Sequence, residues 1–372
     1  MSIATLQFPV VALSTTLMHY AVLQQDISPM AATIPFLLFN IIIPMIRMGP
    51  ANIWTLSAMA VYLSSALRYL DVAQLQKEVV HKWSFNDYCE YMISFEVSDK
   101  SPKKAEDKKE PLRTMQQRAV PYEDMTYDYL KKEAITLLIK FFVWNLILMH
   151  IILNRKDWYP KPYEIASSLS FMRDCYLLGI ACAMALDMSF TLFNHASSLY
   201  FKIPFVPIMN HPYLATSVGD FWSNRWNLIV HNNLRRGIFT PFLRSFGYTL
   251  PLPKGVRIAP HVLMMGAFAT FLFSGIFHEW MIFVMFELPT IGEQLSYFLV
   301  QGIMSTLEIV VKKYVLKTFG INLEKTIPYP IKIVYTNMVM ILSSPLFLNP
   351  YIRENLLTKY HPGYALMWKP SY

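Results

Sequence analysis

The sequence predicts an all-α protein, a polytopic transmembrane helical bundle of about eight or nine spans with amphipathic helices at the membrane interface. Hydrophobic residues make up 54% of the chain and charged residues only 16%, whereas a soluble domain carries about a quarter charged residues. Apolar runs recur along nearly the whole length. Two regions, one rich in charge and one basic and aromatic, interrupt these runs.

Each apolar run is expected to form one helix. The Met-Gly-Pro sequence at 48–50 breaks the second run from the third and predicts a tight antiparallel pair. Asp174 and Asp187 in the fifth run are expected to face protein rather than lipid. Glu308 and Lys312 in the seventh are four residues apart and are expected to pair. The expected spans are 5–23, 31–48, 51–69, 134–153, 170–193, 259–286, 294–315 and 330–348.

We expect three regions along the chain: N-terminal membrane helices over 1–70, a polar, charged loop over 71–133, and a membrane core over 134–372. Nine of the twelve residues 99–110 are charged. Such a run buries too little apolar surface to order itself, so it is expected to be a solvated loop. The aromatic flanks of this loop favour interfacial helices.

The region 200–260 contains seven basic residues and one acid, Asp220. With its many Pro, Trp and Phe residues, it is expected to form amphipathic helices at the interface. The net charge of +8 suits anionic lipid headgroups or a phosphorylated cosubstrate. The three cysteines show neither a disulfide framework nor metal-binding spacing.

His278 lies inside an apolar run that reads as a membrane helix. An imidazole is costly at membrane depth, so His278 is a candidate functional residue, with a purely structural role as the alternative. Its pKa range suits a general base. The sequence after His278 lacks the second histidine of a zinc-protease helix, which argues against a metal site.

A second candidate element is the segment from Asp220 to Arg236, which we expect to form one helix capped by Asp220. On that helix Asn224, Asn227 and His231 would share one face. A polar stripe on an otherwise apolar helix indicates a water-accessible or substrate-lined cavity, with a structural hydrogen-bond network as the alternative.

Two short motifs carry a family resemblance. Residues 221–227, Phe-Trp-Ser-Asn-Arg-Trp-Asn, resemble the FYxDWWN-type motif of membrane-bound O-acyltransferases and lie closer to the DFWGRRWN form of the wax-synthase branch. Residues 274–279, Ser-Gly-Ile-Phe-His-Glu, resemble the family's SGxxHE element. Ser223 and Asn224 depart from the wax-synthase form, and this leaves any role of position 224 in doubt. The likeness covers roughly residues 205–290.

The resemblance implies transfer of an acyl group from acyl-CoA to a hydroxyl inside a helical bundle. It places the catalytic histidine at His278 and the motif asparagine at Asn227. His278 would deprotonate the acceptor hydroxyl, and Asn227 would orient the imidazole or donate a hydrogen bond to the oxyanion. Acyl-CoA is the expected cosubstrate, with no permanently bound cofactor and no metal. The residues expected to hold acyl-CoA are Arg225, Arg235, Arg236 and Trp226.

A long-chain alcohol is the expected acceptor, because apolar side chains surround the candidate residues and suit a molecule with one reactive hydroxyl. The leading interpretation is therefore a wax-synthase-like O-fatty-acyltransferase, multi-pass in the endoplasmic reticulum membrane, that contacts membrane lipids and no nucleic acid. One alternative is an O-acetyltransferase acting on a terpenoid or sterol hydroxyl. A more distant one is a lipid transporter or lipid-binding protein with a proton path through His278, Asp174 and Asp187.

Overall fold

The computed structural model describes residues 14–47, 53–93, 120–154, 169–248, 252, 256–286, 291–311 and 326–353. Over these residues the chain is helical, apart from turns, loops and an isolated antiparallel bridge between Val120 and Phe205. The all-α prediction is confirmed. The expected charged loop at 99–110 and the breaker at 48–50 lie outside the described residues.

Four of the described helices are long and apolar enough to cross a bilayer. Each contains one of the expected runs or most of it, and α6 and α7 continue beyond their apolar part. These helices give the protein the character of an integral membrane protein, while the number of eight or nine spans stays a prediction. The four are α6 (Tyr127–Asn154), α7 (Leu169–Phe201), α11 (Pro260–Met285) and α15 (Tyr329–Arg353).

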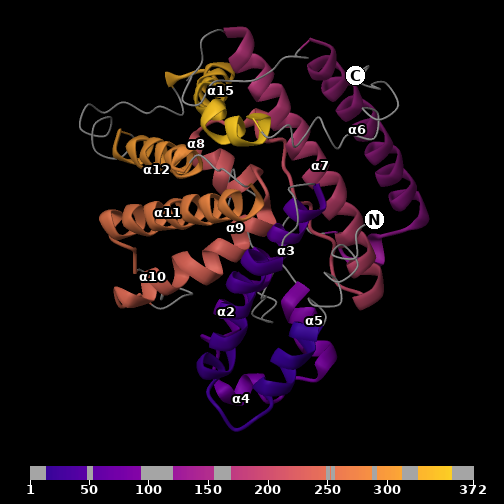
Figure 1. Cartoon of the computed structure of the whole chain (residues 1–372), viewed down its shortest axis with the longest axis vertical. Coiled ribbons are helices and arrows are strands. Elements are labelled where there is room, and N and C mark those ends of the chain that lie inside the picture. The colour runs from indigo at the N-terminus through magenta and orange to yellow at the C-terminus, as the bar shows by residue number, and fades with distance from the viewer. Residues whose placement is uncertain are drawn as a thin grey trace.

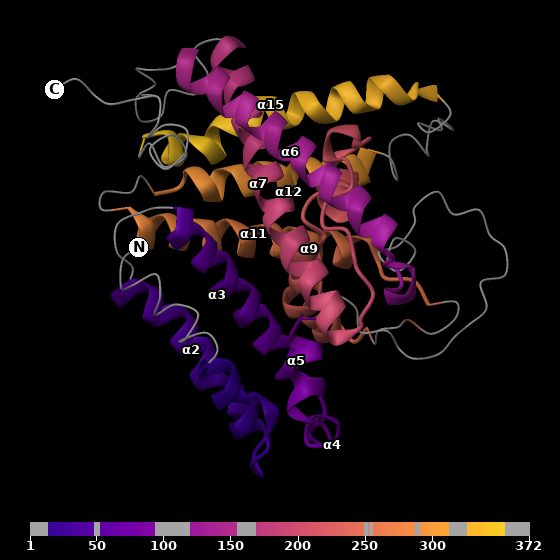
Figure 2. The same ribbon diagram turned by 90° about the vertical axis from the view of Figure 1, so that its right-hand side faces the viewer.

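The central part of the fold is a stack of α11, α12 (Glu293–Val310) and α15, with α6 and α7 running across it (Figures 1 and 2). A core of buried apolar side chains joins α6, α7, α11 and α15. Its fully buried members include Leu148, Leu178, Ile282 and Leu348, each no more than 3% exposed. Burial of such side chains stabilises the fold by about 1.5–3 kcal/mol each. The packing fixes α11, which bears His278.

The contact between α11 and α12 depends on Gly275, because a Cβ there would lie 2.8 Å from Leu295 Cδ1 and 3.2 Å from Leu295 Cα. We expect Gly275→Val to lower the free energy of unfolding by about 1–3 kcal/mol, since the helices must separate to relieve the clash. Gly179→Ala on α7 is the control, because its Cβ would meet only Leu348, at 3.8 Å. Thermal unfolding in detergent measures both, and equal shifts of Tm would contradict this account.

The N-terminal helices form a second packed unit. Helices α2 (Pro29–Arg47) and α3 (Ile53–Val72) lie side by side (Figure 2), and α4 (Lys77–Val80) and α5 (Phe85–Ile93) follow. The expected polar region 71–133 is thus helical in part. Its C-terminal flank forms a short 3-10 turn, η2 (Tyr122–Asp124), before α6 begins. The core of the second unit is made by Leu23, Ala32, Val72, Val80 and Tyr88.

The two aspartates expected to avoid lipid are buried, as predicted. The Asp187 carboxylate accepts a hydrogen bond from Lys140 Nζ at 2.6 Å, which joins α7 to α6. Asp174 accepts one from Arg173 Nε at 2.8 Å. In an apolar surrounding, a paired carboxylate costs far less free energy than an isolated one. Ion pairing therefore explains the presence of both aspartates in an apolar helix.

Candidate functional site

His278 lies on α11, where its ring faces Phe298 of α12 and Phe347 of α15. Its Nδ1 is 2.8 Å from the Ser274 carbonyl oxygen. A carbonyl only accepts hydrogen bonds, so Nδ1 carries the proton and Nε2 keeps a free lone pair. The half-buried ring lies 4.5 Å from the Phe298 ring centre and 5.5 Å from that of Phe347. The tautomer leaves Nε2 able to accept a proton.

Glu279, the sequence neighbour of His278, serves a different purpose. Its Oε1 accepts a hydrogen bond from the Leu295 backbone N–H at 2.8 Å, in the first turn of α12. Helix N-termini have free N–H groups and favour negative charge, so this carboxylate stabilises the start of α12. Glu279 thus fixes α12 against α11, and it makes no hydrogen bond to the imidazole, as its position one residue along the helix indicates.

The prediction of one helix from Asp220 to Arg236 is wrong. After α8 (Val218–Asp220), the chain forms a π-helical turn, η4 (Phe221–Arg225), and then an extended residue, Trp226. A new helix, α9 (Leu228–Leu234), starts after Asn227 and continues into η5 (Arg235–Phe239) and α10 (Thr240–Ser245). The break falls within the motif at residues 221–227, so this motif is a turn between helices.

Asn227 causes the break. Its φ of 29° lies in the left-handed region that asparagine tolerates better than most residues. Its Oδ1 accepts a hydrogen bond from the Val230 backbone N–H at 3.2 Å, which caps α9. Asn227 is buried, and its backbone N–H lies 3.2 Å from the Met209 sulfur. Among the described residues, its Nδ2 makes no hydrogen bond, so one donor stays available.

The cap of the preceding helix is also not the expected one. Ser217, not Asp220, caps α8, because its Oγ accepts a hydrogen bond from the Asp220 backbone N–H at 2.9 Å. The Asp220 carboxylate instead accepts from Arg225 Nε at 2.7 Å and from Asn224 Nδ2 at 3.1 Å. These bonds close the π-helical turn and fix its shape.

The expected polar stripe is therefore divided between two elements. Asn224 bonds within η4 and Asn227 caps α9, while His231 lies further along α9. Burial, with a smaller contribution from the Arg235 charge, lowers the pKa of His231 to about 4. His231 is therefore neutral at pH 7. The arrangement supports the structural alternative for Asn224 rather than a continuous polar face.

The three arginines expected to hold acyl-CoA differ in their surroundings. Arg225 is paired with Asp220, as described above. Arg236 is ion-paired with Asp71 on α3, and its guanidinium lies 4.8 Å from the centre of the Tyr91 ring. Arg235 is exposed and, within the described part of the chain, makes no ion pair. Its charge alone among the three is therefore open to a ligand.

Helix α12 brings the two motifs together. Trp222 Nε1 donates a hydrogen bond to Gln301 Oε1 at 3.2 Å, and the Trp222 ring lies 5.9 Å from that of Phe298. Phe298 also contacts the ring of His278. Asn227 and His278 are not hydrogen-bonded to each other in this structure. The structure thus connects the two motifs through an aromatic side chain of α12. Trp226 stacks on Phe221, with 5.3 Å between ring centres.

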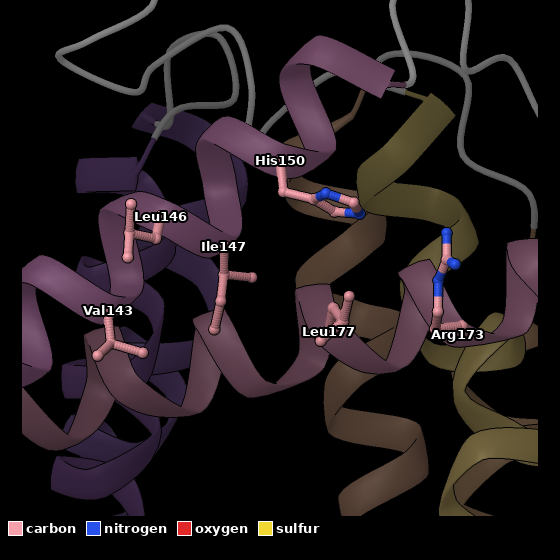
Figure 3. A pocket seen from close by; sticks show the side chains of 6 residues that line it. All are labelled: Val143, Leu146, Ile147, His150, Arg173 and Leu177. Atoms are coloured by element: carbon pink, nitrogen blue, oxygen red, sulfur yellow. The ribbon is translucent and has the colours of Figure 1, made fainter.

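A cavity of about 360 Å³ lies elsewhere, between α6 and α7 (Figure 3). The predicted site residues are not among its lining. Its two basic side chains are His150 at the C-terminal end of α6 and Arg173 at the N-terminal end of α7, and Arg173 is already paired with Asp174. The other lining residues are Val143, Leu146, Ile147 and Leu177. In the described part of the chain, no three His, Cys, Asp or Glu residues are grouped as metal ligands would be.

Comparison with known proteins agrees with the two motifs. Residues 205–301 match the membrane bound O-acyl transferase family. An acyl-CoA–sterol O-acyltransferase of Arabidopsis thaliana is 32% identical over 206 residues, 55% of this chain and 56% of that protein. Two probable long-chain-alcohol O-fatty-acyltransferases of the same plant are also similar. One is 40% identical over 107 residues, which is 29% of each chain. The other is 32% identical over 130 residues, which is 35% of this chain and 36% of the relative.

The apolar helices indicate an integral membrane protein, and one region of it matches an acyltransferase family. The resemblance predicted from the motifs is confirmed: residues 205–301 match the membrane bound O-acyl transferase family, and the chain is similar to long-chain-alcohol O-fatty-acyltransferases, the wax-synthase-like branch. The matched segments span about half the length of the first relative and about a third of the other two. Both motifs lie within the matched region.

Three residues with contacts to the motifs were not anticipated as site residues: Phe298, Gln301 and Glu308, all on α12. The expected pairing of Glu308 with Lys312 falls partly outside the described residues. Glu308 accepts hydrogen bonds from the backbone of α8, just before the first motif, and the pairing with Lys312 stays a prediction. One sequence signal was available, because a glutamate and a glutamine seven residues apart on an apolar helix share one face and need polar partners.

Proposed function

We propose that the protein is an acyl-CoA-dependent O-acyltransferase that esterifies a hydrophobic alcohol, with a long-chain alcohol as acceptor. The observation that carries this proposal is the meeting of the two motifs at Phe298, inside the region that matches the family. The names of two of the relatives, long-chain-alcohol O-fatty-acyltransferases, support the choice of acceptor.

In the proposed reaction, Nε2 of His278 takes the proton of the acceptor hydroxyl as the hydroxyl oxygen forms a bond to the thioester carbonyl carbon. The free Nδ2 of Asn227 donates a hydrogen bond to the oxyanion that develops there. The carbon–sulfur bond then breaks, and the CoA thiolate leaves with the proton returned by the imidazolium. The products are an ester and CoA.

For the acyl-CoA site, we propose that Arg235 contacts a phosphate of CoA, and that Arg225, Arg236 and Trp226 shape the surrounding surface. Arg235→Ala is expected to raise KM for acyl-CoA by about fivefold with little change in kcat, as for the loss of one exposed charge contact. Arg244→Ala is the control, because Arg244 is also exposed but its NH1 donates to Gln74 Oε1 at 3.0 Å. An equal rise of KM in both variants would point to general charge attraction.

The sterol acceptor is a second candidate, and the first relative supports it, because that relative is named for a sterol and its match covers more of this chain than those of the other two. The transporter alternative has less support, since Asp187 and Asp174 already pair with Lys140 and Arg173. The endoplasmic reticulum location stays a prediction.

The test is a matrix of acyl-CoA donors and acceptors assayed with microsomes from a host that lacks neutral-lipid synthases. The donors range from acetyl-CoA to long-chain acyl-CoA, and the acceptors are long-chain alcohols, sterols and terpenoid alcohols. Long-chain esters of fatty alcohols are the expected product. Sterol or terpenoid esters alone would select the second candidate. Absence of every ester from folded, well-expressed protein would overturn the acyltransferase proposal.

A further inference from the structure

Glu308 makes an unusual contact between distant parts of the chain. Its Oε1 accepts a hydrogen bond from the Val218 backbone N–H at 2.9 Å, and its Oε2 accepts one from the Gly219 N–H at 3.2 Å. Both N–H groups lie in the first turn of α8, where no helical carbonyl is available to them. The carboxylate from α12 thus satisfies two donors at once, and the Tyr335 hydroxyl of α15 hydrogen-bonds to it as well.

The hydrogen bonds of Glu308 hold the residues that come directly before the motif at 221–227. The residue after Gly219 is Asp220, whose carboxylate accepts from Arg225 and Asn224 and so closes η4. Asn227 follows two residues after Arg225. The position of α8 therefore decides where this turn begins, and the turn decides where Asn227 lies.

The same helix face also contacts the other motif. Phe298, Gln301 and Glu308 are spaced by three and seven residues, so they project from one side of α12. Phe298 contacts His278, Gln301 accepts from Trp222, and Glu308 holds α8. Helix α12 thus contacts His278 directly, and it contacts Trp222 of the motif that contains Asn227.

We infer that Glu308 is a positioning residue, which fixes the motif turn so that Asn227 is held at the correct place relative to His278. This inference rests on the proposed function for its effect on catalysis, but its structural part does not. A misplacement of about 1 Å in an active site is enough to lower a rate by about 10²-fold.

The structural part is tested by hydrogen exchange of the purified full-length protein. In Glu308→Ala, the amides of Val218 and Gly219 are expected to exchange at least about tenfold faster, because they lose their acceptors. Glu293→Ala is the control: Glu293 is on the same helix and is ion-paired with Arg353 at the opposite end of α12. Unchanged exchange at these amides in Glu308→Ala, or equal acceleration in the control, would overturn the inference.

The catalytic part is tested by kinetics of ester formation. Glu308→Ala is expected to lower kcat by about 10–10²-fold with a smaller effect on KM for acyl-CoA. Glu308→Gln keeps the shape and one acceptor oxygen, so it should recover part of both kcat and amide protection. Combining Glu308→Ala with Asn227→Ala should cost less than the product of the two single effects, because both act through Asn227.

The two hypotheses fail in different ways. If the wild-type protein makes no ester, the proposed function fails, and the exchange result still decides whether Glu308 holds α8. If the wild type makes esters but Glu308→Ala has normal kcat, the positioning role is overturned and the proposed function stands. The same holds if kcat of the double variant falls by the full product of the two single effects.

Discussion

Replacing His278 by alanine is expected to slow ester formation by about 10²–10⁴-fold, while the protein still accumulates in the membrane. The reason is the tautomer: Nδ1 is committed to the Ser274 carbonyl, so Nε2 is the lone pair available to the acceptor hydroxyl. No neighbouring side chain replaces it, since Glu279 is bound to the start of α12. Initial rates per amount of protein, measured in microsomes, check this.

His195 provides a closely matched control. Its Nδ1 lies 2.8 Å from the carbonyl oxygen of Thr191, also four residues earlier on a helix, and its ring packs 3.9 Å from that of Phe205. His195→Ala therefore removes the same type of hydrogen bond and a similar ring contact at a residue outside both motifs. Ester formation should persist in that variant. Near-normal turnover by His278→Ala, or an equal loss in both, would contradict the role of His278 as the base.

Replacing Asn227 is expected to have the second largest effect. Asn227→Ala removes the Nδ2 donor, and loss of one oxyanion donor costs about 2.7–4 kcal/mol of transition-state stabilisation. The same change removes the cap of α9, which costs about 0.5–2 kcal/mol of stability. The rate of ester formation and Tm should therefore both fall, and the two effects need to be separated.

Asn227→Asp separates them. Aspartate keeps an acceptor oxygen for the Val230 N–H and tolerates positive φ, but it has no N–H to donate. Tm should return close to the wild-type value while kcat stays low. Ser84→Ala is the control, because it removes a cap of the same type from α5, where Ser84 Oγ accepts a hydrogen bond from the Asp87 backbone N–H at 3.1 Å, and it leaves the motif turn unchanged. Full recovery of activity in Asn227→Asp would show that Asn227 acts only through the fold.

The helical class and the positions of the long spans were predictable, because apolar length alone identifies a membrane helix. The candidates His278 and Asn227 were also identifiable, since each lies in a short motif with an unusual polar residue. The path of the chain through 220–236 was not predicted. Periodicity favoured one helix there, and the signal that overrides it is local, an asparagine able to take positive φ and to cap the helix that follows.

Contacts between distant parts of the chain could not be predicted from the sequence. Nothing in the spacing of Arg225 and Arg236 shows that each already has a carboxylate partner, because Asp71 lies on another helix and Asp220 becomes a partner only when the chain turns. For the same reason the contacts of Glu308 with the backbone of α8 were not predicted. Sequence spacing describes neighbours on one element, whereas partners between elements depend on the packing of the bundle.

The ion pair between Arg236 and Asp71 has a consequence for how the chain could be recombined. The expected boundary between the regions 1–70 and 71–133 falls inside α3, and the carboxylate that balances Arg236 lies just past it. A chimera that takes the whole of α3 from another protein, Asp71 included, would leave a largely buried guanidinium without its counter-charge, at a cost of about 3–5 kcal/mol. The N-terminal helices are thus electrostatically part of the unit that carries the motifs, and exchange of this part of the protein requires an acid at position 71.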